Sequence, residues 1–271
     1  MSFFDYNPIP ESSPYYLNPF SFPHLAAIGT LLVLVILIVV FRKRLAGWKG
    51  EPILRLVMTI VAVFFEVSLH ILQLATQGWY DFLRGVIPFD LCAITLWLSG
   101  AINASKRRWI YDLLYFWGWG AAASYLFANT GGANWNTYHF WQYFILHGYV
   151  LLTMAWFGAV HGYRVRLRSL GAAFVVLFPI SLAVRLFDSA FAGEPYKFNF
   201  MYLVSPPDVH SPLDHFGHGW GYYFAFVALG VSVLVAVWLP WGIADGLRQL
   251  RGRGSCRIEP ASDRNADERA F

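Results

Sequence analysis

Residues 31–44 read LLVLVILIVVFRKR, an unbroken apolar run that ends in a cluster of basic side chains. The same arrangement recurs along the chain, because most of the twenty Lys and Arg residues fall into four patches that follow long apolar stretches. The first patch covers residues 42–49, and the others cover residues 106–108, 164–168 and 248–257. Such alternation is typical of a membrane protein whose loops on one side carry the positive charge.

The composition indicates the same class of protein. The chain is 57% hydrophobic and 13% charged, whereas a soluble globular domain carries about 25% charged residues. Its apolar stretches approach or exceed the roughly 20 residues that a helix needs to cross the hydrocarbon core. We predict seven spans, at residues 24–42, 53–75, 87–104, 109–128, 139–161, 169–190 and 220–244. The predicted fold class is therefore all-α, a polytopic membrane protein with seven transmembrane helices.

The basic patches also predict the orientation of the chain. Each patch follows an odd-numbered span, and Lys and Arg concentrate in the cytoplasmic loops of membrane proteins. We therefore expect a multi-pass protein of the cell membrane with its N-terminus outside and its C-terminus inside. Residues 1–23 are expected to form an external arm, residues 24–246 the transmembrane domain, and residues 247–271 a basic, disordered cytoplasmic tail.

The net charge of +4 does not call for a nucleic-acid partner. Orientation signals account for the basic patches, which also favour anionic lipid head groups. No basic surface interleaved with aromatic residues suggests RNA or DNA binding, so membrane lipid is the expected partner, and we predict no cofactor. Cys92 and Cys256 are expected on opposite sides of the membrane, where they cannot form a disulfide.

A group of polar side chains falls in the outer half of the predicted bilayer: Glu66, His70, Asp90, Cys92, His147 and Arg185. Ionisable groups at such a depth are costly and are typical of functional sites. The spacing of Glu66, His70 and Gln73 places all three on one face of the second span. A long external loop at residues 191–219 is expected to lie over these side chains.

Cys92 and His147 suggest a nucleophile and its base. Pro88 favours a helix start, so Cys92 falls in the first turns of the third span, where the helix dipole stabilises a thiolate. His147 lies at a matching depth in the fifth span, and Asp90 or Glu66 could orient its ring, as nucleophilic catalysis requires. The spacing leaves two simpler alternatives open. A membrane cysteine can serve as a small apolar residue, and His147 can form a structural hydrogen bond between two helices.

Four short motifs carry a family resemblance: PFDLC at 88–92, LYFWG at 114–118, FILHG at 144–148 and NFMYL at 199–203. In this order they resemble the YwaF-type family of seven-span membrane proteins, over about residues 50–240. That family is similar to an animal transmembrane acyltransferase that moves fatty acyl groups onto ether lysophospholipids with a cysteine and a histidine. The resemblance implies that Cys92 and His147 are that pair. Asp90 stands where the family usually has a histidine.

These patterns favour a lipid acyltransferase or acyl hydrolase with catalytic Cys92, His147 and Asp90. The residues expected to bind the lipid are Glu66, His70, Gln73, Arg185, Asn199 and Tyr202, with Arg185 suited to a phosphate. One alternative is a zinc-dependent membrane lipid hydrolase that uses His215 and His218, which metal analysis would distinguish. Another is a non-enzymatic protein that binds or transports a lipid or small molecule, although the chain lacks the two similar halves typical of transporters.

Overall fold

The computed structural model describes residues 3–5, 7–207 and 212–255, and these residues form helices and connecting loops with no β-strand among them. This confirms the predicted all-α class. The helices are α1 (Phe22–Ala46), α2 (Glu51–Thr76), α3 (Trp79–Val86), α4 (Leu91–Ser105), α5 (Arg108–Trp117), α6 (Trp119–Leu126), α7 (Tyr138–Ala159), α8 (Leu167–Ala190) and α9 (Gly219–Ser255), with short 3-10 turns η1 (Phe200–Tyr202) and η2 (Pro212–Phe216).

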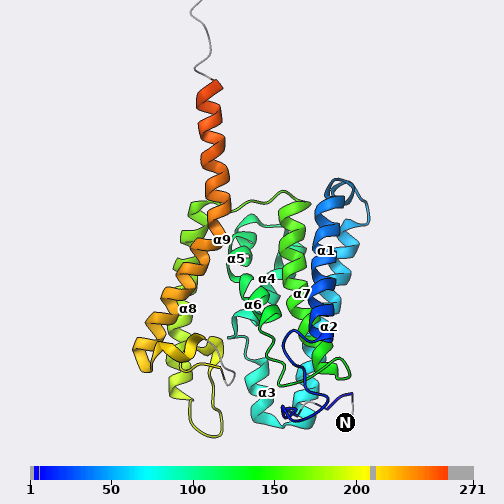
Figure 1. Ribbon diagram of the computed structural model, residues 1–271, viewed down its shortest axis with the longest axis vertical. Helices are drawn as coiled ribbons and strands as arrows, with labels where there is room; N and C mark the ends of the chain where they lie inside the picture. Colours follow the sequence, from blue (N-terminus) through cyan, green and yellow to red (C-terminus); the bar gives the residue numbers. More distant parts are fainter. Residues whose placement is uncertain (1–2, 6, 208–211, 256–271) are drawn as a thin grey trace, which may run out of the picture.

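The long helices run roughly parallel to the long axis of the molecule (Figure 1). α1, α2 and α7 lie side by side on one flank, α8 and α9 pack together on the other, and α4 to α6 fill the space between them. The N-terminal segment and α3 lie at one end, whereas α9 extends beyond the opposite end. The chain therefore begins and finishes its helical path at opposite ends of the bundle.

Four helices are long and apolar enough to cross a membrane by length and composition: α1, α2, α8 and α9 over Gly219–Arg248. α3 and α4 pass the same test only together, with a bend of 54° between them, which brings the number to as many as five among the described residues. The predicted third span is thus preceded by a separate short helix. Pro88 lies in the turn between the two helices.

The predicted fourth span is divided into α5 and α6 at Gly118. A Cβ atom at this position would collide with the side chain of Met154 on α7. Glycine is therefore needed for α5 and α6 to lie this close to α7, and its low helix propensity suits a break in the helix. The stretch at 109–128 is apolar throughout, so its composition does not reveal the break.

α7 is the central helix, and it contacts α1, α2, α4, α5 and α6. Its buried side chains surround it and include Phe144, Tyr149, Trp156 and Phe157. A helix that faces protein on all sides does not need the aliphatic surface that lipid requires, which explains why α7 carries Tyr, Trp, His and Gln instead. At roughly 1.5 Å per residue it is nevertheless about 33 Å long, enough to cross a hydrocarbon core of about 30 Å.

The N-terminal arm packs against the loop between α6 and α7. Ile9 N–H donates to the carbonyl of Gly131 at 2.8 Å, and Leu17 N–H donates to that of Gly132 at 2.9 Å. His24, which is fully buried, then fixes the start of α1. Its Nε2 donates to the carbonyl of Tyr125 at 2.7 Å, and its Nδ1 accepts the N–H of Phe20 at 2.9 Å.

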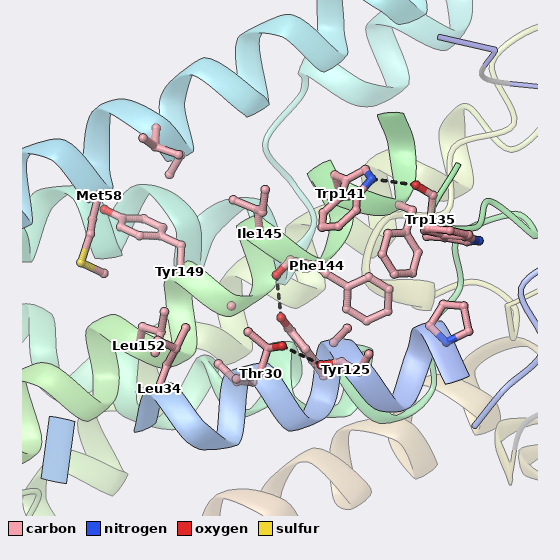
Figure 2. Close-up of a pocket in the computed structure, with 18 of the residues that line it drawn as sticks. Thr30, Leu34, Met58, Tyr125, Trp135, Trp141, Phe144, Ile145, Tyr149 and Leu152 are labelled. Atoms are coloured by element: carbon pink, nitrogen blue, oxygen red, sulfur yellow. Dashed lines mark hydrogen bonds between the residues drawn. The ribbon is translucent and has the colours of Figure 1, made fainter. Parts of the chain in front are cut away.

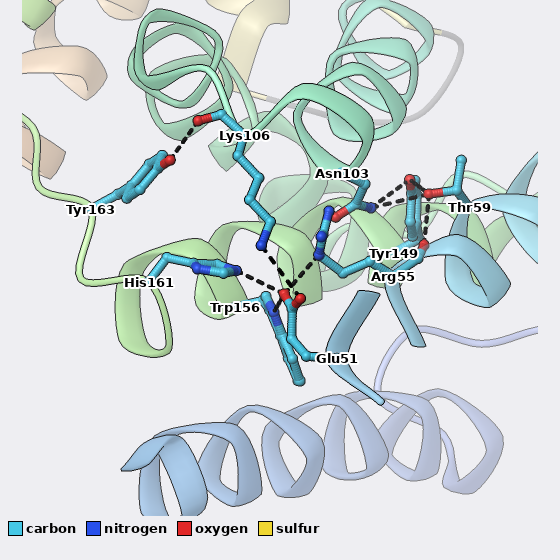
Figure 3. A network of polar contacts seen from close by, with 9 residues as sticks. All are labelled: Glu51, Arg55, Thr59, Asn103, Lys106, Tyr149, Trp156, His161 and Tyr163. Carbon is cyan, nitrogen blue, oxygen red and sulfur yellow. Dashed lines mark hydrogen bonds and ion pairs between the residues drawn. The ribbon is translucent and has the colours of Figure 1, made fainter. Parts of the chain in front are cut away.

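The opposite end of the bundle is held by a buried carboxylate at the start of α2 (Figure 3). Glu51 Oε1 accepts hydrogen bonds from Arg55 Nε at 2.6 Å, Trp156 Nε1 at 3.1 Å and His161 Nε2 at 2.8 Å. Lys106 Nζ lies 3.5 Å from Oε2. One side chain thereby ties α2 to the ends of α4 and α7, and its charge is met by several donors, as a buried carboxylate requires.

α9 continues to Ser255, so residues 247–255 of the predicted disordered tail are helical. The remainder of that tail, residues 256–271, lies outside the described residues.

We expect Glu51→Ala to lower the free energy of unfolding by about 3 kcal/mol, because it leaves Arg55 and its neighbours buried without their acceptor. Unfolding in detergent micelles followed by circular dichroism measures this. Glu194→Ala is the matched control, since Glu194 pairs with Lys197 in an exposed ion pair and exposed pairs contribute little. Equal stability of the two variants would contradict the assignment.

Candidate functional site

A cavity of about 280 Å³ with a mixed polar and apolar lining lies between α2, α3, α4 and α7. We call it the inner cavity. It brings together five of the predicted site residues, which come from three helices: Glu66, His70, Asp90, Cys92 and His147. Arg84, Asn129, His139, Gln142 and Tyr143 complete its polar lining. The residues that the sequence analysis expected at one depth thus line one cavity.

Cys92 lies in the first turn of α4, which begins at Leu91 with Asp90 at the N-cap position. Its side chain is exposed, and it borders both the inner cavity and a second, apolar pocket of about 360 Å³. The start of the helix therefore places the thiol between the inner cavity, which holds the polar side chains, and an apolar pocket.

His147 is held in one tautomer. Its Nδ1 lies 2.7 Å from the carbonyl oxygen of Tyr143, and because a carbonyl can only accept, Nδ1 carries the proton. In the neutral ring this leaves the lone pair on Nε2, which is the form that a general base needs. The ring also packs against that of Tyr143, with centroids 4.3 Å apart. The Tyr143 carbonyl thus orients His147 at Nδ1, the role that the sequence suggested for Asp90 or Glu66.

Glu66 and His70 form a pair on the α2 wall of the inner cavity. His70 Nε2 lies 3.4 Å from Glu66 Oε1, and His70 Nδ1 lies 3.3 Å from Gln73 Oε1. His70 therefore has a polar partner at each ring nitrogen, and the three residues on one helical face contact one another along this wall.

Asp90 connects α4 to the segment at 199–203. Its Oδ1 accepts the N–H of Met201 at 2.8 Å. Met201 and Tyr202 have φ angles of 53° and 55°, a left-handed conformation that costs energy for residues with side chains. The Asp90 bond helps to hold this strained segment in place beside Cys92.

Further hydrogen bonds fix the same segment from its other side. Tyr222 of α9 donates to the carbonyl of Tyr202 at 2.8 Å, and Arg185 of α8 donates to the carbonyl of Leu203. The Asn199 side chain donates to the Ser205 carbonyl at 3.0 Å and accepts the N–H of Val204 at 3.1 Å. The Asn199 side chain therefore shapes the loop through its hydrogen bonds to the backbone of Val204 and Ser205.

Tyr202 lies between two spaces of opposite character. With Asp90, Cys92 and Met201 it lines the apolar pocket, whose other walls come from α6, α8 and α9. It also lines a polar mouth of about 810 Å³ that includes Gln73, Arg84, Asp90, Lys197 and Asn199. Asp90 borders all three spaces. A molecule with a polar head and an apolar chain would meet both kinds of surface near Cys92.

Arg185, the predicted phosphate ligand, points elsewhere. It is buried, with its guanidinium 4.6 Å from the ring centre of Trp220 and 5.3 Å from that of Tyr223. Its contact with Leu203 makes it a support for the loop. The sequence analysis overlooked Arg84, which lines both the polar mouth and the inner cavity. Arg84 is one of the few basic residues outside the four patches. Its isolation from those patches is the sequence feature that could have identified it as a site residue.

His215 and His218, the residues of the zinc alternative, lie in η2 and just before α9. Within the described part of the chain, no group of three or more His, Cys, Asp and Glu side chains is arranged to hold a metal ion.

A family model matches residues 19–239 of the chain, and it describes the TMEM164 family. The matched region covers the helices from α1 to most of α9. No curated protein and no solved structure matches the sequence.

We expect Asp90→Ala to speed amide hydrogen exchange at Met201 and its neighbours by roughly tenfold or more, because it removes a charged acceptor from the strained segment. Hydrogen exchange read by mass spectrometry over residues 199–203 measures this. Asp90→Asn keeps an acceptor oxygen and should preserve most of the protection, and Asp81→Ala should leave it unchanged. Unaltered exchange in Asp90→Ala would show that other contacts hold the loop.

Proposed function

This chain belongs to the TMEM164 family of transmembrane proteins, and from that premise we propose that it is a membrane enzyme acting on lipid acyl groups. In this proposal Cys92 is the nucleophile and His147 the general base, and the reaction is acyl transfer or acyl hydrolysis. The YwaF-type resemblance of the motifs around both residues is consistent with the proposal.

The observation that carries the proposal is the position of Cys92 at the boundary of two spaces. The inner cavity holds His147 with its Nε2 lone pair available, and the apolar pocket on the other side is lined mainly by side chains such as Leu177, Phe178, Phe226 and Leu234. An acyl chain in the apolar pocket would bring its ester carbonyl to the thiol, and an adjacent base is what activates a cysteine.

The chemistry proceeds in two balanced steps. The Cys92 sulfur attacks the carbonyl carbon of a lipid ester, a C–S bond forms, and the C–O bond to the glycerol oxygen breaks. His147 Nε2 takes the thiol proton and returns it to the departing alkoxide. The oxygen of a lysophospholipid hydroxyl, or of water, then attacks the thioester carbon, so that a C–O bond forms and the C–S bond breaks. His147 passes the proton of the attacking group to the departing sulfur. The thiol is restored at the end of the cycle.

The polar mouth suits the head group of the substrate. Arg84 and Lys197 supply positive charge there, and Asn129 and Asn199 supply amide groups. Arg84 is the candidate for a lipid phosphate, since guanidinium groups bind phosphate oxygens in pairs. Arg185 keeps an indirect role, because it holds the carbonyl next to Tyr202.

We also propose seven spans with the N-terminus outside. The count includes α7, α5 with α6 as one broken span, and α3 with α4 as a bent span. The basic patches support the orientation, and the placement of the N-terminal segment and the end of α9 at opposite ends of the bundle supports an odd number of spans.

Labelling of an engineered thiol tests this topology. In a Cys92→Ser, Cys256→Ser background, Asn134→Cys should react with an impermeant maleimide added to intact cells, because Asn134 lies in the loop between α6 and α7. Ser105→Cys, at the C-terminal end of α4, should react only after permeabilisation. The reverse pattern would overturn the proposed orientation.

We expect Cys92→Ser to lower acyl turnover by about a thousandfold or more, because the hydroxyl replaces the nucleophilic thiolate with little change of shape. His147→Ala should lower it by a similar factor, since the two residues act as a unit. The assay follows labelled acyl groups released or transferred from a panel of phospholipids, with a monodisperse gel-filtration profile as the folding control.

Cys256→Ser is the matched control, as it replaces the only other cysteine of the chain, and it should keep full turnover. Full turnover in well-folded Cys92→Ser would rule out the nucleophile. Absence of turnover in the wild type, with lipid still bound, would favour a non-enzymatic lipid-binding role.

A further inference from the structure

A second apolar space lies beside α7 (Figure 2), and Cys92 is not among its lining residues. It is a groove of about 500 Å³ between α1, α2, α6 and α7. The groove is lined by apolar side chains along most of its length, among them Leu34, Met58, Phe144, Ile145 and Leu152. The proposed chemistry does not involve it.

α7 separates this groove from the site. Tyr143 and His147 face the inner cavity, whereas Phe144, Ile145 and Gly148 face the groove. The two spaces are therefore distinct, and a molecule in the groove cannot reach the Cys92 thiol through the helix.

The polar groups in the walls are already engaged. Thr30 Oγ1 donates to the carbonyl of Ala26 at 2.8 Å, and the Tyr125 hydroxyl donates to that of Phe144 at 2.8 Å. Trp141 Nε1 donates to the carbonyl of Trp135 at 2.8 Å. Because these donors have partners within the protein, the walls recognise shape and apolar surface, and the matching occupant is a hydrocarbon.

The dimensions of the groove limit the occupant further. Its lining on α1 runs from Phe22 to Leu34, a distance of about 18 Å at 1.5 Å per residue. An extended alkyl chain of about this length would lie along the α1 wall of the groove.

The location matches one leaflet of a bilayer. The length of about 18 Å is close to half of a hydrocarbon core of about 30 Å. Trp135 and Trp141 lie at one end of the groove, and Leu34, Met58 and Leu152 lie at the other (Figure 2). Tryptophan is typical of the membrane interface, so the tryptophan end is where a lipid head group would lie.

We propose that this groove binds one acyl chain of a membrane phospholipid, with the head group beside Trp135 and Trp141. The bound chain fills the space between α1 and α7, and it is a second lipid site, separate from the one at Cys92. The inference does not depend on the proposed enzyme activity.

Photo-crosslinking tests the groove. The full-length protein is reconstituted in phosphatidylcholine vesicles that contain phosphatidylcholine with a diazirine on one acyl chain, and the labelled residues are identified by mass spectrometry. The wild type should be labelled at Ile145 and Leu152 on α7. Cys92→Ser should give the same labelling, which separates this result from the fate of the proposed enzyme activity.

Thr30→Trp places a large side chain in the groove and should abolish the label on α7, and Ala26→Trp is a second variant with the same expectation. Leu32→Trp is the matched control, because Leu32 is 55% exposed on the opposite face of α1, and it should keep the label. Unchanged labelling in folded Thr30→Trp and Ala26→Trp would overturn the proposal. So would labelling of Ile145 no stronger than that of an outward residue such as Val175, which is 68% exposed.

Discussion

The hydrogen bond from Met201 N–H to Asp90 Oδ1, 2.8 Å long, is the contact on which the geometry of the site depends. It joins the start of α4 to a segment whose φ angles at Met201 and Tyr202 are left-handed. Two residues after Asp90, the chain presents Cys92 to the inner cavity and to the apolar pocket. Without the bond, the strained segment would lose the contact that holds it against α4, and the wall formed by Tyr202 between the polar mouth and the apolar pocket would move. Asp90 borders all three spaces and holds the segment at Met201 by this hydrogen bond, so it is a positioning residue.

The polar side chains at the two ends of the bundle are arranged differently. At one end Glu51 is buried and satisfied by donors from several elements, which locks α2, α4 and α7 together. At the other end the polar side chains surround open space, and Glu66, His70 and His147 line it. Polar groups in an apolar environment are costly unless they are paired. The network around Glu51 stabilises the bundle, and this stability can offset the cost of the polar side chains that line the inner cavity. α7 carries both, with Trp156 at the Glu51 network and His147 at the inner cavity.

The all-helical membrane class could be predicted from the sequence. Equal depth on three helices indicated that Glu66, His70, Asp90, Cys92 and His147 could meet, and the structure brings them to one cavity. The catalytic roles of these residues remain predictions, as does the number of seven spans. Depth follows from residue counting along a helix, which requires no knowledge of how the helices pack.

Side-chain direction could not be predicted in the same way, because it depends on the rotation of each helix and on the path of the loops. Arg185 contacts Leu203 and Trp220 and does not line the inner cavity. The partner of His147 is a backbone carbonyl, which every residue possesses and which no sequence pattern marks.

The most direct test of Cys92 as the nucleophile is intact mass spectrometry of wild-type protein quenched during turnover of a labelled phospholipid. The account predicts an acyl adduct on Cys92 that neutral hydroxylamine removes, as a thioester requires. Turnover without any adduct on Cys92, or with the adduct on another residue, would contradict it.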